Sequence, residues 1–265
     1  MIERKLREIS PALLKERLKT RFLGREIIYF PSVSSTNSYA LMLAANGAPE
    51  GTVVIAEEQT RGRGRWNRKW HSPPLVGLYF SLILKGKTSK ESIGVLSLLS
   101  AIVVAEAIAE FIPSKPDLRW PNDVLIGGRK VAGILIEEVK GKGLVVGIGI
   151  NVNQAKGDFP PELWNEATSL FIESGWTIER NELFLSLMER FEHWYKIFKT
   201  NGLEEIVNRF EELSSYSRGK KVKLFLRDGP VKGTTGGLFP GGELKVLLPG
   251  GEEIKVSASE LVRLQ

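Results

Sequence analysis

The sequence predicts an α+β protein in which a sheet flanked by helices is followed by a small antiparallel β-domain. Up to about residue 213, short β-branched runs alternate with long helical patterns, as expected of a sheet covered by helices. After Tyr216 the helical patterns stop, and alternating apolar residues are separated by glycine pairs or Asp-Gly. We therefore place a larger domain at residues 1–217 and a smaller one at residues 218–265.

The larger domain is expected to begin with one charged amphipathic helix over residues 1–24, because apolar residues stand at helical spacing there: Ile2, Leu6, Ile9, Leu13, Leu14 and Leu18. This leaves no room for a separate N-terminal domain. The β-branched runs predict strands at 26–30, 52–57, 76–84, 117–126, 130–139 and 143–152. Further helices are expected at 36–46, at 90–111 and, broken near Asn201 and Gly202, at 180–213.

The smaller domain is expected to be a barrel of short strands. Val222, Leu224 and Leu226 share one face of its first strand, and turn signals recur every several residues after it.

Composition narrows the functional classes. The net charge is +6, from 37 basic and 31 acidic residues, which favours anionic partners without identifying them. The chain has no cysteine and two histidines, which excludes thiolate sites and histidine metal clusters. The longest charge-free apolar run, residues 92–105, is too short to cross a bilayer, and the N-terminal segment lacks a signal-peptide core. We expect a cytoplasmic protein without a membrane partner.

The strongest local signal is the segment Arg61–Trp70, which carries five cationic side chains around two glycines. Glycine lets backbone N–H groups approach an anion, and arginine matches phosphate oxygens with paired hydrogen bonds. The segment therefore predicts a phosphate-binding loop. The alternatives are a flexible basic loop and a nucleic-acid contact in which Trp66 and Trp70 stack on bases.

A second signal is a proline-containing segment followed by a glycine pair. Pro121 cannot donate to a central ladder, and Gly127-Gly128 predicts a tight hairpin turn, so one ribbon brings Asn122, Asp123 and Lys130 together. Asp123 is then a candidate Mg²⁺ ligand, Asn122 a candidate nucleotide contact, and Lys130 a candidate partner for a carboxylate attacking a phosphate. Taken alone, an exposed hairpin with an ordinary Asp–Lys pair is the simpler interpretation.

Two further segments are ambiguous by themselves. Glycines alternate with β-branched residues in Gly147–Asn153, which marks close approach of a ligand, a bulge or tight packing equally well. Ser34–Asn37 is explained by capping of the helix that follows. Gln59 carries no signal of its own.

Taken in order, these segments closely resemble those of biotin protein ligases. The matching residues are Ser35-Thr-Asn37, Gln59, Gly62-Arg-Gly-Arg65, Arg119-Trp-Pro-Asn-Asp123, Lys130-Val-Ala-Gly-Ile-Leu-Ile-Glu137 and Gly147-Ile-Gly-Ile-Asn151. The resemblance runs from about Phe22 to the C-terminus and favours the phosphate interpretation of the basic segment. It implies a mixed sheet of the class II aminoacyl-tRNA synthetase and biotin ligase type, flanked by helices, with a small SH3-like C-terminal β-barrel.

The resemblance also implies two half-reactions with ATP, biotin and Mg²⁺. Biotin carboxylate attacks the α-phosphate of ATP to give biotinyl-5′-adenylate and pyrophosphate, and a lysine of a biotin carboxyl carrier protein then attacks the mixed anhydride. Some members carry an N-terminal DNA-binding module, for which this chain has no room, so no DNA partner is expected. Homodimerisation through a sheet edge is common in the family.

Residue roles follow from the matched motifs. The resemblance assigns biotin to Ser35, Thr36, Asn37, Gln59, Arg63, Gly64, Arg65, Lys130, Gly133 and Leu135. It assigns ATP and the adenylate to Arg63, Arg65, Arg68, Trp70, Asn122, Asn151 and Lys130. The implied catalytic residues are Lys130, Arg63 and Asp123, with Asp123 also the expected Mg²⁺ ligand.

Two departures and two rivals accompany this interpretation. Asn67 stands where many relatives have glycine, and Arg119 stands where many have lysine. The nearest rival is a lipoate or octanoate ligase of the same fold. The other is a non-enzymatic nucleic-acid-binding protein that uses the Arg/Trp segment as its contact surface.

Overall fold

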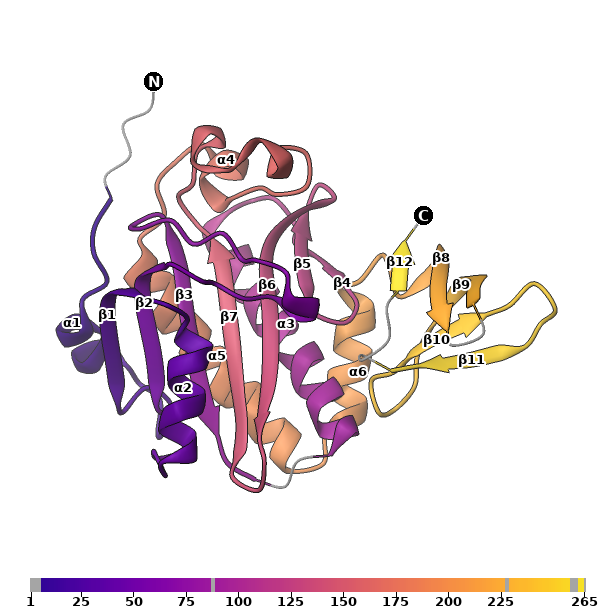
Figure 1. Cartoon of the computed structure of the whole chain (residues 1–265), viewed down its shortest axis with the longest axis horizontal. Coiled ribbons are helices and arrows are strands. Elements are labelled where there is room, and N and C mark those ends of the chain that lie inside the picture. Colours follow the sequence, from indigo (N-terminus) through magenta and orange to yellow (C-terminus); the bar gives the residue numbers. More distant parts are fainter. Residues whose placement is uncertain (1–5, 87–88, 227–228, 258–261, 265) are drawn as a thin grey trace.

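The computed structural model describes residues 6–86, 89–226, 229–257 and 262–264. A seven-stranded mixed sheet carries helices on both faces, and a five-stranded antiparallel sheet follows at the C-terminal end (Figure 1). This arrangement confirms the predicted α+β fold class.

The larger sheet has the strand order β1-β2-β3-β7-β6-β5-β4. Its strands are β1 (Ile27–Val33), β2 (Val53–Gln59), β3 (Gly77–Leu84), β4 (Asp117–Arg119), β5 (Asp123–Ile126), β6 (Arg129–Val139) and β7 (Gly143–Asn151). Only β1 and β2 pair in parallel; the other neighbours are antiparallel. Every residue of β3 and β7 is buried, because helices cover both sides of these central strands.

The helices are α1 (Pro11–Arg17), α2 (Thr36–Ala45), α3 (Lys90–Phe111), α4 (Leu170–Ser174), α5 (Arg180–Lys199) and α6 (Leu203–Glu212). Helix α2 lies on one face of the larger sheet, whereas α3, α5 and α6 lie on the other (Figure 1). Short 3-10 turns occur at Arg65–Asn67, Lys156–Asp158 and Pro161–Leu163. The predicted helices at 36–46, 90–111 and 180–213 are therefore confirmed, including the break at Asn201, where φ is +64°.

Helix α3 is apolar over a longer stretch than the charge-free run at 92–105 suggested. By length and composition the window Ser92–Phe111 is sufficient to span a membrane, and it is the one such helix among the described residues. However, 72% of this window is buried inside the protein. Its two glutamates, Glu106 and Glu110, are paired with arginines of α5 and α6, as in a core helix.

The C-terminal sheet has the order β11-β10-β9-β8-β12. Its strands are β8 (Arg218–Leu226), β9 (Gly229–Leu238), β10 (Leu244–Leu247), β11 (Glu253–Val256) and β12 (Val262–Leu264). Val222 and Leu224 are buried as predicted, whereas the side chain of Leu226 lies outside the described set. The sheet shares one continuous apolar core with the larger domain, and the Trp120 Nε1–H donates to the Gly242 carbonyl at 2.9 Å. Closure into an SH3-like barrel stays a prediction.

The single N-terminal helix expected over residues 1–24 is wrong. Among the described residues of this segment the helix runs only from Pro11 to Arg17, with Ser10 as its cap. Ile9, just before this helix, lies against the sheet instead, because its N–H donates to the buried Glu57 carboxylate at 2.6 Å. Ile2, part of the predicted pattern, lies outside the described residues.

The single strand expected over 117–126 is also wrong. It is two antiparallel strands, β4 and β5, separated at Trp120-Pro121, whose peptide bond is cis. Proline lacks the N–H that a continuous ladder needs. The predicted turn at Gly127-Gly128 is confirmed, since both residues have positive φ and join β5 directly to β6.

Candidate active site

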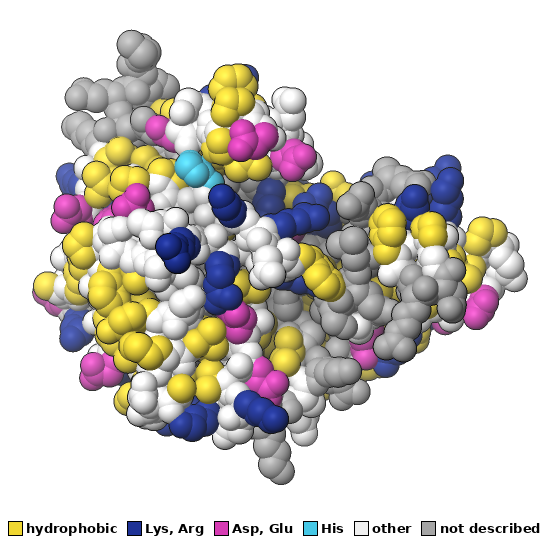
Figure 2. Space-filling model, in the orientation of Figure 1, with side chains coloured by type: hydrophobic (Ala, Val, Ile, Leu, Met, Phe, Trp, Pro, Cys, Tyr) yellow, Lys and Arg dark blue, Asp and Glu magenta, His cyan; other side chains and the backbone are white. Residues whose placement is uncertain are grey.

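The segment Arg61–Trp70, hereafter the basic loop, leaves the end of β2 and crosses one face of the sheet (Figure 1). Lys and Arg side chains gather over the middle of this face (Figure 2). Backbone hydrogen bonds from Gly64 N–H to Arg68 O (2.7 Å) and from Trp70 N–H to Gly62 O (2.9 Å) close the loop on itself. Asn67 has φ +57°, a conformation that asparagine tolerates well, so this departure from glycine is accommodated.

A cluster of short polar side chains, hereafter the polar pocket, lies where α2 begins. It consists of Ser35, Thr36, Asn37, Gln59 and Ser81. Ser35 caps α2 as predicted, by accepting from the Ser38 N–H. Gln59 Oε1 accepts from both the backbone N–H and the hydroxyl of Thr36, at 2.9 and 3.1 Å.

Ser81 completes the polar pocket from the central strand β3. Its hydroxyl lies 2.6 Å from Asn37 Oδ1 and 2.8 Å from Thr36 Oγ1. The Asn37 amide donates in turn to the Leu135 carbonyl and to Glu137, at 3.3 and 2.8 Å. Ser81, Thr36 and Asn37 are all buried, so these contacts form in a low-dielectric environment and fix the side chains.

The alternating glycines of β7 make room for these side chains. A Cβ atom on Gly147 would lie 2.0 Å from Asn37 Oδ1, and one on Gly149 would lie 2.4 Å from Trp70 Nε1. Trp70 also covers Gly133 of β6, and its buried Nε1–H has no hydrogen-bond partner within the described structure. The glycines therefore mark tight packing against Asn37 and Trp70, one of the alternatives that the sequence left open, and approach of a ligand to Gly147–Asn153 stays a prediction.

Asp123 stands between two cations. Lys130 Nζ lies 2.5 Å from Asp123 Oδ1, and Arg119 Nη2 lies 2.7 Å from Asp123 Oδ2. Burial by itself would raise the pKa of Asp123, but Lys130 and Arg119 outweigh burial and hold that pKa below its usual range. The hairpin thus brings Asp123 and Lys130 together as predicted, and Arg119 joins them.

Two arginines of the basic loop reach the site from either side of Gly64. Arg65 donates to Asn122 Oδ1 at 2.9 Å, and Asn122 donates to the Ile134 carbonyl. Arg63 pairs with Glu137 at 2.7 Å. Burial lowers the pKa of Arg65, which means that its charge is partly stripped of water.

Two other residues predicted to contact the nucleotide, Arg68 and Asn151, lie in different surroundings. Arg68 is exposed, and its charge lies close enough to Arg65 to contribute to the lowered pKa of that guanidinium. Asn151 is buried, and its amide donates to the Thr168 carbonyl at 3.0 Å and to the Lys130 carbonyl at 3.5 Å. Asn151 therefore holds the backbone beside Lys130.

The residues that the structure describes do not form a magnesium site of their own. Both oxygens of Asp123 are already bonded to cations, and no group of three potential metal ligands occurs among the described His, Cys, Asp and Glu residues. Magnesium in nucleotide sites is held largely by phosphates and water.

Comparison with known proteins decides the family. A profile of the Biotin/lipoate A/B protein ligase family matches residues 29–154. The biotin–[acetyl-CoA-carboxylase] ligase of Mycobacterium tuberculosis is 32% identical, and the alignment covers 97% of this chain and 98% of that protein. This chain belongs to the biotin protein ligases.

Two further relatives agree with this family. The bifunctional ligase/repressor BirA of Bacillus subtilis is 40% identical over 80% of this chain, and the match spans 66% of that longer protein. The biotin protein ligase of Aquifex aeolicus, solved with biotin and ATP, superposes with a TM-score of 0.79 at 35% identity and covers 91% of this chain and 100% of that one. The family assignment supports the biotin ligase interpretation over the lipoate ligase and nucleic-acid alternatives.

Ser81 and Glu137 belong to the cluster but were missing from the predicted site. Glu137 ends the motif that begins at Lys130, so its position was a usable signal. Ser81 was hidden in an apolar run of β3, where a single serine carries no signal until its partners on α2 are known.

Proposed function

We propose that this ligase activates biotin with ATP and transfers it to a lysine of an acceptor protein. The observation that carries the proposal is that Lys130 and Arg65 share the field of Asp123, so that two cations converge. Trp70 connects them to the polar pocket, because it lies over Lys130 and packs on Gly149, two residues from the Gly147 that faces Asn37. A carboxylate attacking a phosphate needs such cations, because two anions must approach each other.

Biotin would lie with its rings in the polar pocket. Thr36, Asn37 and Gln59 supply hydroxyl and amide groups that match the ureido group, with Ser35 behind them at the helix cap. Gly133 and Leu135 of β6 supply part of an apolar wall. Gly64 lets the basic loop approach without a side chain in the way.

In the first half-reaction, a biotin carboxylate oxygen bonds to the α-phosphorus of ATP, and pyrophosphate leaves with the electrons of the broken P–O bond. Lys130 neutralises the approaching anions, while Arg63 and Arg65 close over the adenylate. Asp123 is a positioning residue for Lys130. Trp70, Asn122 and Arg68 would line the nucleotide side, and Asn151 would fix the backbone there.

In the second half-reaction, the acceptor lysine nitrogen bonds to the biotinyl carbonyl carbon, AMP leaves, and the nitrogen releases a proton. The proposed acceptor is a biotin carboxyl carrier protein, in line with the relative named for acetyl-CoA carboxylase. We also propose action in the cytoplasm, a division into domains at 1–217 and 218–265, and homodimerisation through a sheet edge. The absence of a DNA partner stays a prediction.

Pyrophosphate release tests the proposal. The purified protein is mixed with Mg²⁺ and ATP and given biotin, lipoate or octanoate in turn, and release is expected with biotin alone. Lys130→Ala should slow release by a factor on the order of 100 to 1,000, the usual loss for one donor that stabilises a transition state. Lys196→Ala, which removes an exposed lysine from α5, is the matched control and should release pyrophosphate at the parental rate.

Each other outcome has a definite meaning. Release with lipoate or octanoate but not with biotin would reassign the substrate within the broader ligase family. Parental release by Lys130→Ala would contradict the role of Lys130.

A further inference from the structure

Tyr79 of β3 carries a buried hydroxyl beside the point where the chain returns from the basic loop. The side chain is fully buried, and its hydroxyl donates to the Pro73 carbonyl at 3.2 Å. A Cβ atom on Gly77 would lie 1.9 Å from this hydroxyl, so glycine at that position leaves the space free. The structure thus leaves room for the hydroxyl, although a phenylalanine ring would be sufficient for packing alone.

A buried chain of amides continues from this hydroxyl toward Lys130. Gln154 Nε2–H lies within 3.3 Å of both the Tyr79 hydroxyl and Asn151 Oδ1. The Asn151 amide then contacts the Thr168 and Lys130 carbonyls. An unbroken path of hydrogen bonds therefore joins Pro73 to the backbone of Lys130.

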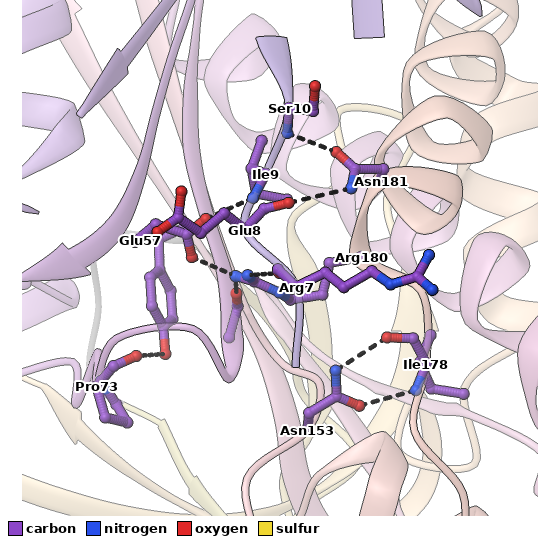
Figure 3. A network of polar contacts seen from close by, with 12 residues as sticks. Arg7, Glu8, Ile9, Ser10, Glu57, Pro73, Asn153, Ile178, Arg180 and Asn181 are labelled. Carbon is purple, nitrogen blue, oxygen red and sulfur yellow. Dashed lines mark hydrogen bonds and ion pairs between the residues drawn. The ribbon is translucent and has the colours of Figure 1, made fainter. Parts of the chain in front are cut away.

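The surroundings of Tyr79 keep its hydroxyl protonated and its strand fixed. Burial raises the pKa of the Tyr79 hydroxyl far above its usual value, while nearby Arg180 opposes this rise, so the hydroxyl keeps its proton. Arg180 pairs with Glu57 at 2.6 Å (Figure 3). Arg180 also donates to the Gly77 carbonyl at 2.8 Å. This buried pair holds the strand beneath Tyr79 in place.

We propose that Tyr79 is a positioning residue that couples Pro73, just after the basic loop, to Lys130 and to the segment around Thr168. Gln154 and Asn151 are the links. Both the loop and the Lys130 strand would contact the adenylate, so their relative placement decides how long the adenylate is retained. The coupling is a property of the free protein, whereas its effect on the adenylate rests on the proposed function.

The test compares two tyrosines. Tyr79→Phe removes the linking hydroxyl, and Tyr195→Phe removes another buried hydroxyl, bonded to Glu50 and the Lys85 carbonyl away from the site. In Tyr79→Phe, amide hydrogen exchange without ligand should rise about fivefold both at residues 70–76 and at 151–169, as for the loss of one buried hydrogen bond. In Tyr195→Phe both segments should exchange at the parental rate.

Retention of biotinyl-adenylate gives the second readout. Its dissociation should be about fivefold faster from Tyr79→Phe than from the parent, and unchanged in Tyr195→Phe. Gln154→Leu cuts the same path at the next link and serves as the test if Tyr79→Phe does not fold. Both changes break one path. The double variant should therefore lose the adenylate no faster than whichever single variant loses it faster.

Three results would overturn the coupling. One is increased exchange in Tyr79→Phe that is confined to residues 70–76. Another is a double variant whose effects multiply to about 25-fold, as expected of independent sites. The third is parental adenylate retention in Tyr79→Phe. Failure of the parent to form an adenylate would instead contradict the proposed function, and the exchange experiment would still decide the coupling.

Discussion

The two ends of the site are built from different chemistry. The polar pocket uses short, neutral side chains that are buried and bonded to one another, such as Thr36, Asn37 and Ser81. The other end uses long cations, Lys130 and Arg65, whose present partners are a carboxylate and an amide.

This difference matches the two kinds of ligand group. A neutral ring system gains little from charge and is recognised by hydrogen-bonding groups held in fixed positions, where a misplaced partner leaves a buried polar atom unpaired. A phosphate is recognised by charge, and cations that already stand in the site can exchange one anionic partner for another. The pocket should therefore be sensitive to shape and the cationic end to charge.

The largest effect on ligand affinity should come from a methyl group in the polar pocket. In Gly147→Ala the new Cβ would lie 2.0 Å from Asn37 Oδ1, and Asn37 is held by several buried hydrogen bonds, so the pocket cannot yield without breaking them. Calorimetry should show biotin affinity about 100-fold lower, roughly 3 kcal/mol. Gly157→Ala adds the same group where no atom lies within 4 Å and should bind biotin normally. A change below threefold in Gly147→Ala would refute the shape argument.

A smaller effect, dependent on pH, is expected at the cationic end. The pKa of Asp123 is lowered in the folded state, so its stabilisation is present above the unfolded pKa, about 3.9, and is lost as pH falls through the lower folded pKa. Asp123→Asn should therefore reduce the free energy of unfolding at pH 7 by about 2 kcal/mol, with the difference shrinking below about pH 4. Urea unfolding across this range measures it. Glu162→Gln, at an exposed carboxylate, is the control, and a difference for Asp123→Asn that does not vary with pH would contradict the ion-pair explanation.

The smallest effect should be the difference in adenylate release between variants of two arginines in the basic loop. Arg65 is partly desolvated and bonded to Asn122, whereas Arg68 is exposed. Stopped-flow measurement of biotinyl-adenylate release should show about a tenfold increase for Arg65→Ala, which corresponds to roughly 1.4 kcal/mol. For Arg68→Ala the increase should be about twofold or less, because solvent screens an exposed charge. Equal increases in the release rate for the two variants would mean that burial of an arginine does not determine its contribution to adenylate retention.

Much of the fold was predictable because it depends on local patterns. The boundaries of α3 and the Gly127-Gly128 turn follow from periodicity and from glycine, both of which act within a few residues. The N-terminal helix was wrong for the opposite reason. A bond from Ile9 to Glu57, 48 residues away, competes with helix formation and leaves no trace in the local pattern.

The site was predictable to the extent that its residues stand in motifs. Asp123 and Lys130 meet because a hairpin joins them, and the hairpin is visible in the sequence. Ser81, Tyr79 and Gln154 matter through partners on other elements, and their spacing along the chain is uninformative. Their roles therefore became visible only in three dimensions.

The bond between Trp120 and Gly242 changes how the small C-terminal sheet should be regarded. Trp120 stands two residues before Asn122, and its buried N–H depends on a carbonyl supplied by the turn between β9 and β10. Truncation at residue 217 would orphan that donor at a cost of roughly 1 to 3 kcal/mol, next to a nucleotide contact. The C-terminal sheet therefore cannot be removed without disturbing the site. Substitutions in the Gly241-Gly242 turn, which is far from Lys130 in the chain, can affect catalysis through the Trp120 side chain.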